Sequence, residues 1–83
     1  MEDFLASVRY FAGNFAPKGY LQCNGQLLAI SQWSALFALV GTTFGGDGMT
    51  TFALPKLEPR ATANGGTLLP IICVSGYYPS RAD

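Results

Sequence analysis

The sequence contains no histidine, and only 12% of its 83 residues are charged. Without histidine the chain lacks the commonest general base and the commonest metal ligand, which excludes Ser-His-Asp and Cys-His catalysis. Its two cysteines are too few for an all-cysteine zinc site. A formal net charge of +0 removes the electrostatic attraction on which nucleic-acid binders depend. We therefore expect no catalytic residue, no metal, no cofactor and no nucleic-acid partner.

Long apolar runs are also missing. No stretch approaches the roughly 18 apolar residues that a membrane-spanning helix needs, so we expect no membrane insertion. The first residues, Met1-Glu2-Asp3, are acidic, and no basic segment precedes the first apolar run, so no secretory signal peptide is expected. A protein made in the cytoplasm without such a signal can still leave the cell, for example in a particle that lysis releases.

Apolar residues, in contrast, are abundant, at 49% of the chain. At this length we expect one domain over residues 1–83. A domain this small has a high ratio of surface to volume and cannot bury half of its residues in its own core. The remaining apolar surface indicates an oligomer or a permanent partner. A compact monomer, in which small residues raise the apolar count, is the alternative.

Cys23 and Cys73 lie far apart in the sequence, each in an apolar context typical of a strand. A disulfide between them would close a long loop and add about 4 kcal/mol of stability in the chain-entropy model. Because no secretory signal is present, we favour two reduced thiols that are buried as small hydrophobic side chains. The disulfide remains the alternative.

Two segments are typical of β-strands. In residues 4–11 one alternate set of side chains is uniformly apolar, which predicts a half-buried strand with that set facing inward. The set consists of Phe4, Ala6, Val8 and Tyr10. Residues 68–75 form an apolar run rich in β-branched residues, which predicts a buried strand.

Asn24-Gly25 is the strongest turn signal in the chain. Residues 20–23 and 26–30 flank it and are typical of strands. A two-residue type I′ turn needs positive φ at both central positions, which Asn and Gly tolerate best. The sequence therefore predicts a β-hairpin that turns at Asn24 and Gly25.

A short amphipathic helix is predicted at about residues 32–40. Ser31 is a suitable N-cap, and Gly41 stands where a left-handed C-terminal cap belongs. Apolar side chains between them recur at the spacing i, i+3, i+4 and i+7, which is one face of a helix. These are Trp33, Leu36, Phe37 and Val40, and we expect them to fill the core. This position on the apolar face favours core packing for Trp33 over a role as a sugar-stacking platform.

Residues 42–51 hold three glycines in four positions around Asp47, which predicts a tight loop with unusual backbone angles. The glycines concerned are Gly45, Gly46 and Gly48, and Gly41 precedes them. The loop lacks the lysine of a phosphate-binding loop and the several carboxylates of a calcium loop. We interpret it as a structural loop, with surface recognition as the alternative.

The rest of the chain completes the prediction of the fold. In residues 51–57, Phe52 and Leu54 are expected to pack inward, and Pro55 excludes a central strand. Residues 56–67 are polar and read as a surface connection, and residues 76–83 are an aromatic tail that contains proline. We predict a small single-domain α+β fold: short antiparallel strands and a hairpin around one short helix, joined by glycine-rich loops.

Several short motifs occur in a fixed order along the chain. They are Phe15-Ala16-Pro17-Lys18-Gly19-Tyr20, Cys23-Asn24-Gly25-Gln26, Gly41-Thr42-Thr43-Phe44-Gly45-Gly46-Asp47-Gly48, Thr51-Phe52-Ala53-Leu54-Pro55 and the tail Gly76-Tyr77-Tyr78-Pro79-Ser80-Arg81. This order resembles the phage tail collar domain in the version carried by microcystin-dependent-type proteins. The resemblance runs from Phe4 to about Leu57 and resumes in the tail.

The sequence departs from the family pattern in two places. Family members usually continue with a long variable segment before the last strand, and here only residues 61–67 stand in its place. Tyr20 replaces the usual tryptophan, which is a conservative exchange of aromatic side chains. Because receptor recognition in fibre proteins tends to lie in such variable parts, this chain resembles a bare collar scaffold or a compact form without a receptor arm.

The resemblance implies a structural or adhesive module of the virion tail, or of a phage-derived particle, with no enzymatic activity. Fibre proteins of this kind are commonly trimers, so a homotrimer is expected, with a fibre shaft as a further partner. The alternative is a module that binds cell-surface carbohydrate on exposed aromatic and polar side chains. The candidate surface for it consists of Asp47, Tyr77, Tyr78 and Arg81. In the opposite interpretation, the two tyrosines close a sheet edge and Arg81 satisfies backbone carbonyls.

Overall fold

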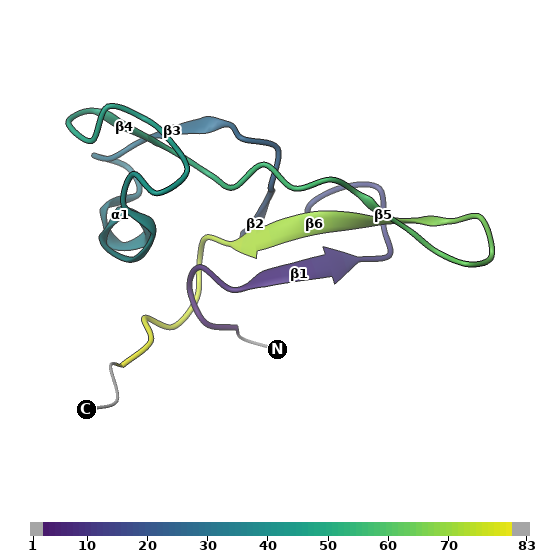
Figure 1. Ribbon diagram of the computed structural model, residues 1–83. Helices are drawn as coiled ribbons and strands as arrows, with labels where there is room; N and C mark the ends of the chain where they lie inside the picture. The colour runs from purple at the N-terminus through teal and green to yellow at the C-terminus, as the bar shows by residue number, and fades with distance from the viewer. Residues whose placement is uncertain (1–2, 81–83) are drawn as a thin grey trace.

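A computed structural model describes residues 3–80 of the chain. In chain order the elements are β1 (Val8–Phe11), β2 (Tyr20–Gln22), β3 (Leu27–Ala29), α1 (Ser34–Val40), β4 (Thr51–Ala53), β5 (Arg60–Ala61) and β6 (Thr67–Cys73). Figure 1 shows a sheet built on β6 at one end and α1 with β3 and β4 at the other. All of the strand pairs are antiparallel, which confirms the predicted small α+β fold.

β6 is the central strand of the larger sheet. β1 and β2 pair with its two edges, in the order β1-β6-β2, and β5 pairs with its first residues. The opposed residues include Val8 with Ile72, Tyr20 with Cys73 and Arg60 with Leu68. The last four residues of β6 are buried, so the prediction of a buried strand in this region is confirmed.

Pro70 lies in the middle of β6, where a residue without an N–H group is unusual. Its carbonyl accepts a hydrogen bond from the N–H of Cys23 at 3.0 Å, so the pairing continues past the end of β2. The carbonyl of Cys23 would face the missing N–H, and it accepts instead from the N–H of Leu57 at 3.0 Å. No buried carbonyl is therefore left without a donor at this point.

The predicted strand over residues 4–11 begins only at Val8, and its predicted inward face was wrong. Phe4 is 56% exposed and Val8 and Tyr10 are also exposed, whereas Leu5 is only 7% exposed. Ala6 has a φ of 72°, which interrupts the extended backbone and changes the direction of the side chains before it. The prediction from alternating residues holds only for one continuous strand. Because the chain kinks at Ala6, the residues before and after it do not share one alternation.

The hairpin predicted at Asn24-Gly25 does not form. β2 pairs with β6, and β3 pairs with β4, so the two flanking segments belong to different sheets. Gly25 still turns the chain, with a φ of 80°. Its N–H, however, donates to the carbonyl of Pro55, at 3.3 Å. The prediction was wrong because the pairing edge of β2 is taken by β6, a strand almost 50 residues away, as the register of the sheet requires.

A hairpin forms instead in the segment that the sequence presents as a polar surface connection. β5 turns back into β6 through residues 62–66, and this hairpin projects beyond the body of the molecule (Figure 1). The N–H of Thr62 donates to the carbonyl of Gly66 at 2.9 Å. Gly65 takes a φ of 89° in the turn. The guanidinium of Arg60 lies over the ring of Tyr10, 4.7 Å from its centre.

α1 starts two residues later than predicted. It begins at Ser34, and Trp33 occupies the N-cap position without a side-chain cap hydrogen bond, so Ser31 is not the N-cap. The preceding residues form a turn, in which the N–H of Gln32 donates to the carbonyl of Ala29 at 3.1 Å. At the other end Gly41 follows the helix, as predicted, with a φ of 61°, and its N–H donates to the carbonyl of Phe37 at 2.7 Å. Its ψ of −149° lies outside the left-handed helical region, so the predicted left-handed cap was wrong in this respect.

The core lies between α1, the β3–β4 pair and the β2 end of the large sheet. Its buried members are Leu5, Cys23, Leu28, Leu36, Val40, Phe52, Leu54 and Ile72. Phe52 and Leu54 are fully buried, as predicted. Trp33 and Phe37 are only partly buried at its margin, and the ring centre of Phe37 lies 5.4 Å from that of Phe52.

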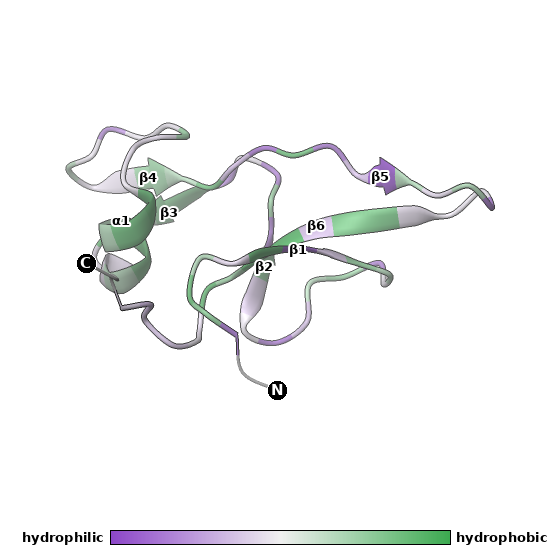
Figure 2. Cartoon of the chain, turned by 60° about the horizontal axis from the view of Figure 1, so that its bottom comes forward, coloured by the Kyte–Doolittle hydropathy of each residue, from purple (hydrophilic) through white to green (hydrophobic). Residues whose placement is uncertain are grey.

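The hydropathy of the elements agrees with the position of the core. In Figure 2, α1 and much of β6 are coloured as hydrophobic, whereas β5 begins with a hydrophilic residue. No helix within residues 3–80 is long and apolar enough to cross a membrane.

Candidate functional site

The loop between α1 and β4 is organised around the carboxylate of Asp47. Its Oδ1 accepts hydrogen bonds from the N–H groups of Met49, Thr50 and Thr51, at 2.8–2.9 Å. Its Oδ2 accepts from the hydroxyl of Thr50 at 2.9 Å. These donors, the N–H of Thr51 foremost, hold the pKa of Asp47 well below its usual range. The carboxylate is therefore ionised, and it fixes the backbone of its own loop.

Close packing of Gly46 against β4 also fixes this loop. Gly46 lies against β4, and a Cβ atom at this position would come within 2.4 Å of the Cα of Phe52. As predicted for the glycines of this region, Gly45, Gly46 and Gly48 all have positive φ. The loop nevertheless presents two large apolar side chains to solvent, because Met49 is 84% and Phe44 51% exposed.

The two tail tyrosines differ from Asp47 in their surroundings. Tyr77 and Tyr78 are each more than half exposed. The backbone of Tyr77 pairs with the start of the chain, since its N–H donates to the carbonyl of Asp3 and its carbonyl accepts from the N–H of Leu5. No hydrogen bond or ion pair within residues 3–80 joins either tyrosine to Asp47. Arg81, the fourth residue of the predicted surface, lies outside the described residues.

A polar cluster that sequence reasoning missed surrounds Asp3. Its Oδ2 accepts from the Nε of Arg9 at 2.5 Å and from the hydroxyl of Tyr20 at 3.0 Å. The Arg9 hydrogen bond lowers the pKa of Asp3 to about 2, and burial raises the pKa of Tyr20. The three residues come from separate parts of the chain, so no spacing in the sequence marks the cluster.

Gly76 closes this cluster against the tail. A Cβ atom there would lie 2.1 Å from the carbonyl oxygen of Asp3 and 2.8 Å from the Sγ of Cys73. Only glycine lets the tail approach the first described residues this closely. Gly76 is visible in the sequence as the first residue of the Gly-Tyr-Tyr motif at residues 76–78. Only the fold shows which atoms this glycine contacts.

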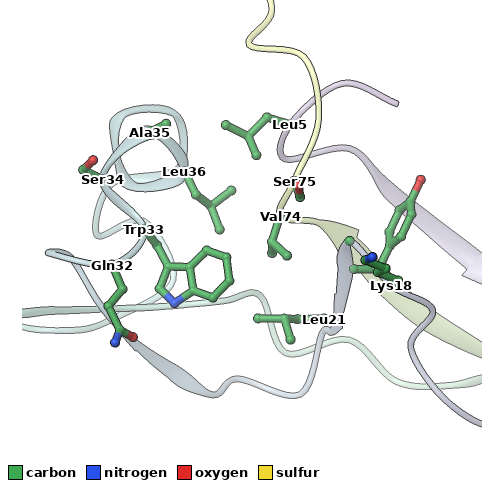
Figure 3. A pocket seen from close by; sticks show the side chains of 12 residues that line it. Leu5, Lys18, Leu21, Gln32, Trp33, Ser34, Ala35, Leu36, Val74 and Ser75 are labelled. Carbon is green, nitrogen blue, oxygen red and sulfur yellow. The ribbon is translucent and has the colours of Figure 1, made fainter. Parts of the chain in front are cut away.

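A groove of about 590 Å³ lies beside the start of α1. We call it the Trp33 groove, and its apolar lining includes Leu5, Leu21, Trp33, Ala35, Leu36 and Val74. Figure 3 shows the indole ring of Trp33 projecting into the groove between α1 and the strands. Its volume is in the range of small-ligand and side-chain pockets. The sequence predicted Trp33 as core, and the structure places it partly in the core and partly on this groove.

Polar side chains stand at the rim of the groove. Lys18, Gln32, Ser34 and Ser75 contribute to its lining, and Figure 3 labels each of them. Lys18 forms no ion pair in the part of the chain that the structure describes. A second hollow, of about 520 Å³, lies between the outer side of α1 and the tail at Tyr78.

These surfaces present side chains that are available for contact with other molecules. Within residues 3–80, no group of three or more His, Cys, Asp or Glu residues could hold a metal ion. The carboxylates of Asp3 and Asp47 both accept hydrogen bonds from groups close to them in the fold. What the surface offers to other molecules is exposed apolar side chains, a groove with an aromatic wall and one lysine at its rim.

Comparison with known proteins adds one match. A family model described as the Phage Tail Collar Domain matches residues 6–62, which is more than half of the chain. The matched segment runs from just before β1 to just after β5 and includes the Asp47 loop. A search of curated proteins and a search of solved structures gave no match.

Proposed function

Because the chain belongs to the phage tail collar domain family, a structural family of phage tails, we propose that it is an assembly module of a tail fibre or of a phage-derived fibre-like particle. We propose further that it works as a homotrimer, alone or on a fibre shaft. In this function the domain contributes shape and cohesive surface, and no covalent step takes place on it.

The observation that supports assembly is the number of large apolar side chains in solvent. Within residues 3–80, nine are more than about a third exposed: Phe4, Val8, Tyr10, Phe15, Leu27, Phe44, Met49, Tyr77 and Tyr78. Single exposed apolar residues are ordinary on monomers, whereas apolar residues that lie together mark interaction sites. Phe44 and Met49 share one loop, and Tyr77 and Tyr78 are adjacent in the tail. Burial of apolar surface between copies is the dominant favourable contribution to association.

Light scattering on a sizing column, over a wide range of protein concentration, tests this proposal. We expect a mass three times the 8.8 kDa of the chain, and a value that does not fall on moderate dilution. A monomeric mass at high micromolar concentration would contradict the proposal of a self-associating module.

A second candidate function, binding of cell-surface carbohydrate, is favoured by the exposure of Tyr77 and Tyr78. Neighbouring exposed aromatic rings suit the apolar face of a sugar, with polar groups beside them to fix its orientation. A panel of bacterial glycans tests it, with the double variant Tyr77→Ala/Tyr78→Ala as the control. Binding that the double variant loses supports this function, and absence of binding across the panel contradicts it.

A further inference from the structure

The loop between α1 and β4 is built to hold apolar side chains in the solvent. We call Phe44 and Met49 the loop patch, and Met49 is the most exposed large apolar residue of the described chain. The backbone beneath it is fixed by the hydrogen bonds to Asp47 and by the close contact of Gly46 with Phe52. A rigid loop loses little conformational entropy when its side chains bind, so this geometry favours recognition.

The Trp33 groove is the complementary feature of the same molecule. Apolar side chains line a hollow that is large enough for the side chains of the loop patch. The thioether of methionine makes favourable contacts with aromatic rings, and the indole of Trp33 stands in the groove (Figure 3). An apolar concave surface and an apolar projecting loop therefore both remain without a partner within the described residues.

The Trp33 groove and the loop between α1 and β4 carry charges of opposite sign. Lys18 lines the groove and has no anionic partner within residues 3–80. Asp47 lies between the two residues of the loop patch in the sequence, and it is the only charged residue from position 42 to position 51. Opposite charges at facing surfaces steer association and set its register.

We propose that the Trp33 groove of one copy receives the loop patch of a second copy, with Lys18 facing the partner's loop carboxylate. This inference rests on the proposed self-association and names the surface that performs it. The loop cannot fill the groove of its own chain, because its hydrogen bonds hold it against β4. Contact between two different surfaces is head-to-tail, and such contacts close into rings when the rotation between copies permits.

The first test changes Met49→Ser and uses Val8→Ser as the matched control. Both positions are exposed, Val8 lies on β1 and does not line the groove, and circular dichroism verifies folding. We expect Met49→Ser to raise the concentration at which the assembly dissociates by about tenfold, as for a central contact of an interface. The Val8→Ser variant is expected to dissociate as the unchanged protein does.

Trp33 provides an internal reporter, because it is the sole tryptophan of the chain. If the groove is filled by a second copy, its fluorescence emission moves to shorter wavelength over the same concentration range in which the mass rises. In Met49→Ser the emission change should move to higher concentration together with the mass. Assembly without any change in Trp33 emission overturns the inference.

The second test reverses the charge at the rim. Lys18→Glu is compared with Lys56→Glu, which makes the same change of net charge at an exposed lysine that does not line the groove. We expect Lys18→Glu alone to weaken assembly, by several-fold at low salt and hardly at about 1 M salt, where charges are screened within about 3 Å. Equal effects of the two variants overturn the predicted pairing of charges.

The outcomes separate this inference from the proposed function. If the unchanged protein forms a trimer that Val8→Ser dissociates and Met49→Ser does not, the interface lies on the sheet. The inference then fails while the assembly function stands. If the unchanged protein remains monomeric at every concentration, the assembly function itself fails and the inference fails with it.

Discussion

Gly46 is the residue at which the backbone leaves the least room for a side chain in the Asp47 loop. Gly65 offers a matched comparison, because its φ of 89° is close to the 93° of Gly46 but nothing lies within 4 Å of the position of its Cβ. We expect Gly65→Ala to cost about 1 kcal/mol of unfolding free energy, from the backbone angle alone. Gly46→Ala should cost roughly 2–4 kcal/mol, because the backbone of Phe52 must also move.

Urea unfolding of both variants measures the two free energies. Equal losses would mean that the loop relaxes around the added methyl group without cost. The sequence predicted unusual backbone angles at the glycines of the Asp47 loop, because glycine tolerates positive φ readily, but the contact of Gly46 with Phe52 depends on the fold.

Asp3 predicts a dependence of stability on acid. The hydrogen bond from Arg9 lowers the pKa of Asp3 from its usual 3.8 to about 2 in the folded protein. A carboxyl group with a lowered folded pKa stabilises the fold above its unfolded pKa, and this contribution disappears as the pH falls through the folded pKa. We expect Asp3→Asn to melt at a lower temperature than the unchanged protein at neutral pH. The difference should shrink between about pH 4 and pH 2.

Thermal melts of both proteins from pH 7 to pH 2 provide the measurement. Asp47 titrates in both proteins alike, so the difference between them isolates Asp3. A difference that stays constant over the whole pH range would contradict the assignment of the ion pair with Arg9.

At the scale of elements, the helix and the small sheet are held together by a pair of phenylalanines. Phe52 of β4 is fully buried, whereas Phe37 of α1 is partly exposed and packs on it at the margin of the core. We expect Phe52→Ala to cost about 3–5 kcal/mol and Phe37→Ala clearly less, because less apolar surface is lost. Helix periodicity alone predicted that Phe37 fills the core, whereas the structure leaves its side chain only partly buried.

Chemical denaturation of the two variants measures the order of these costs. If Phe52→Ala does not fold in the absence of denaturant, its stability is below that of any folded Phe37→Ala variant and the order holds. A larger loss at Phe37 than at Phe52 would contradict the arrangement of the core.

At the scale of elements, the pairs Asn24-Gly25 and Asn64-Gly65 show what local turn propensity can predict. Both glycines take positive φ, as the turn chemistry predicts. Only Gly65, in the segment that the sequence presents as a surface connection, lies in a hairpin turn, between β5 and β6. The turn at Gly25 sends the chain from one sheet to another, because β6 occupies the edge of β2. Propensity predicts where the chain turns, whereas competition between strands decides which segments pair.

At the scale of the whole molecule, the pairing of β2 with β6 decides the state of the two cysteines. Cys73 faces Tyr20, and the register places Cys23 one residue beyond Gln22, on the opposite side of the sheet from Cys73. Both are free and buried, and burial raises the pKa of the Cys23 thiol. We expect neither thiol to react with a thiol reagent in the folded protein and both to react after unfolding.

Thiol titration, with mass spectrometry under oxidising conditions, measures this. A species that carries an intramolecular disulfide while retaining the native circular dichroism spectrum would contradict the register of the sheet. The sequence left both the reduced and the disulfide forms open, because linear separation says nothing about which face of a strand a side chain occupies.

The amino-acid sequence by itself determined those properties that depend on residue type and near neighbours. The lack of histidine removed a class of chemistry, and the glycines predicted positive φ in the Asp47 loop. The ordered motifs indicated the family, and the apolar run over residues 68–75 predicted the buried strand β6. These predictions follow from residue types and their near neighbours in the sequence.

Only the tertiary structure decided the features made by distant residues. The kink at Ala6 reversed the expected inward face of the first strand, and the Asp3 cluster joins residues with no common spacing. The Trp33 groove likewise combines residues from both ends and the middle of the chain. Such contacts depend on which strands pair with the two edges of β6. The strands that could pair there lie far apart in the sequence, so no local pattern predicts the outcome.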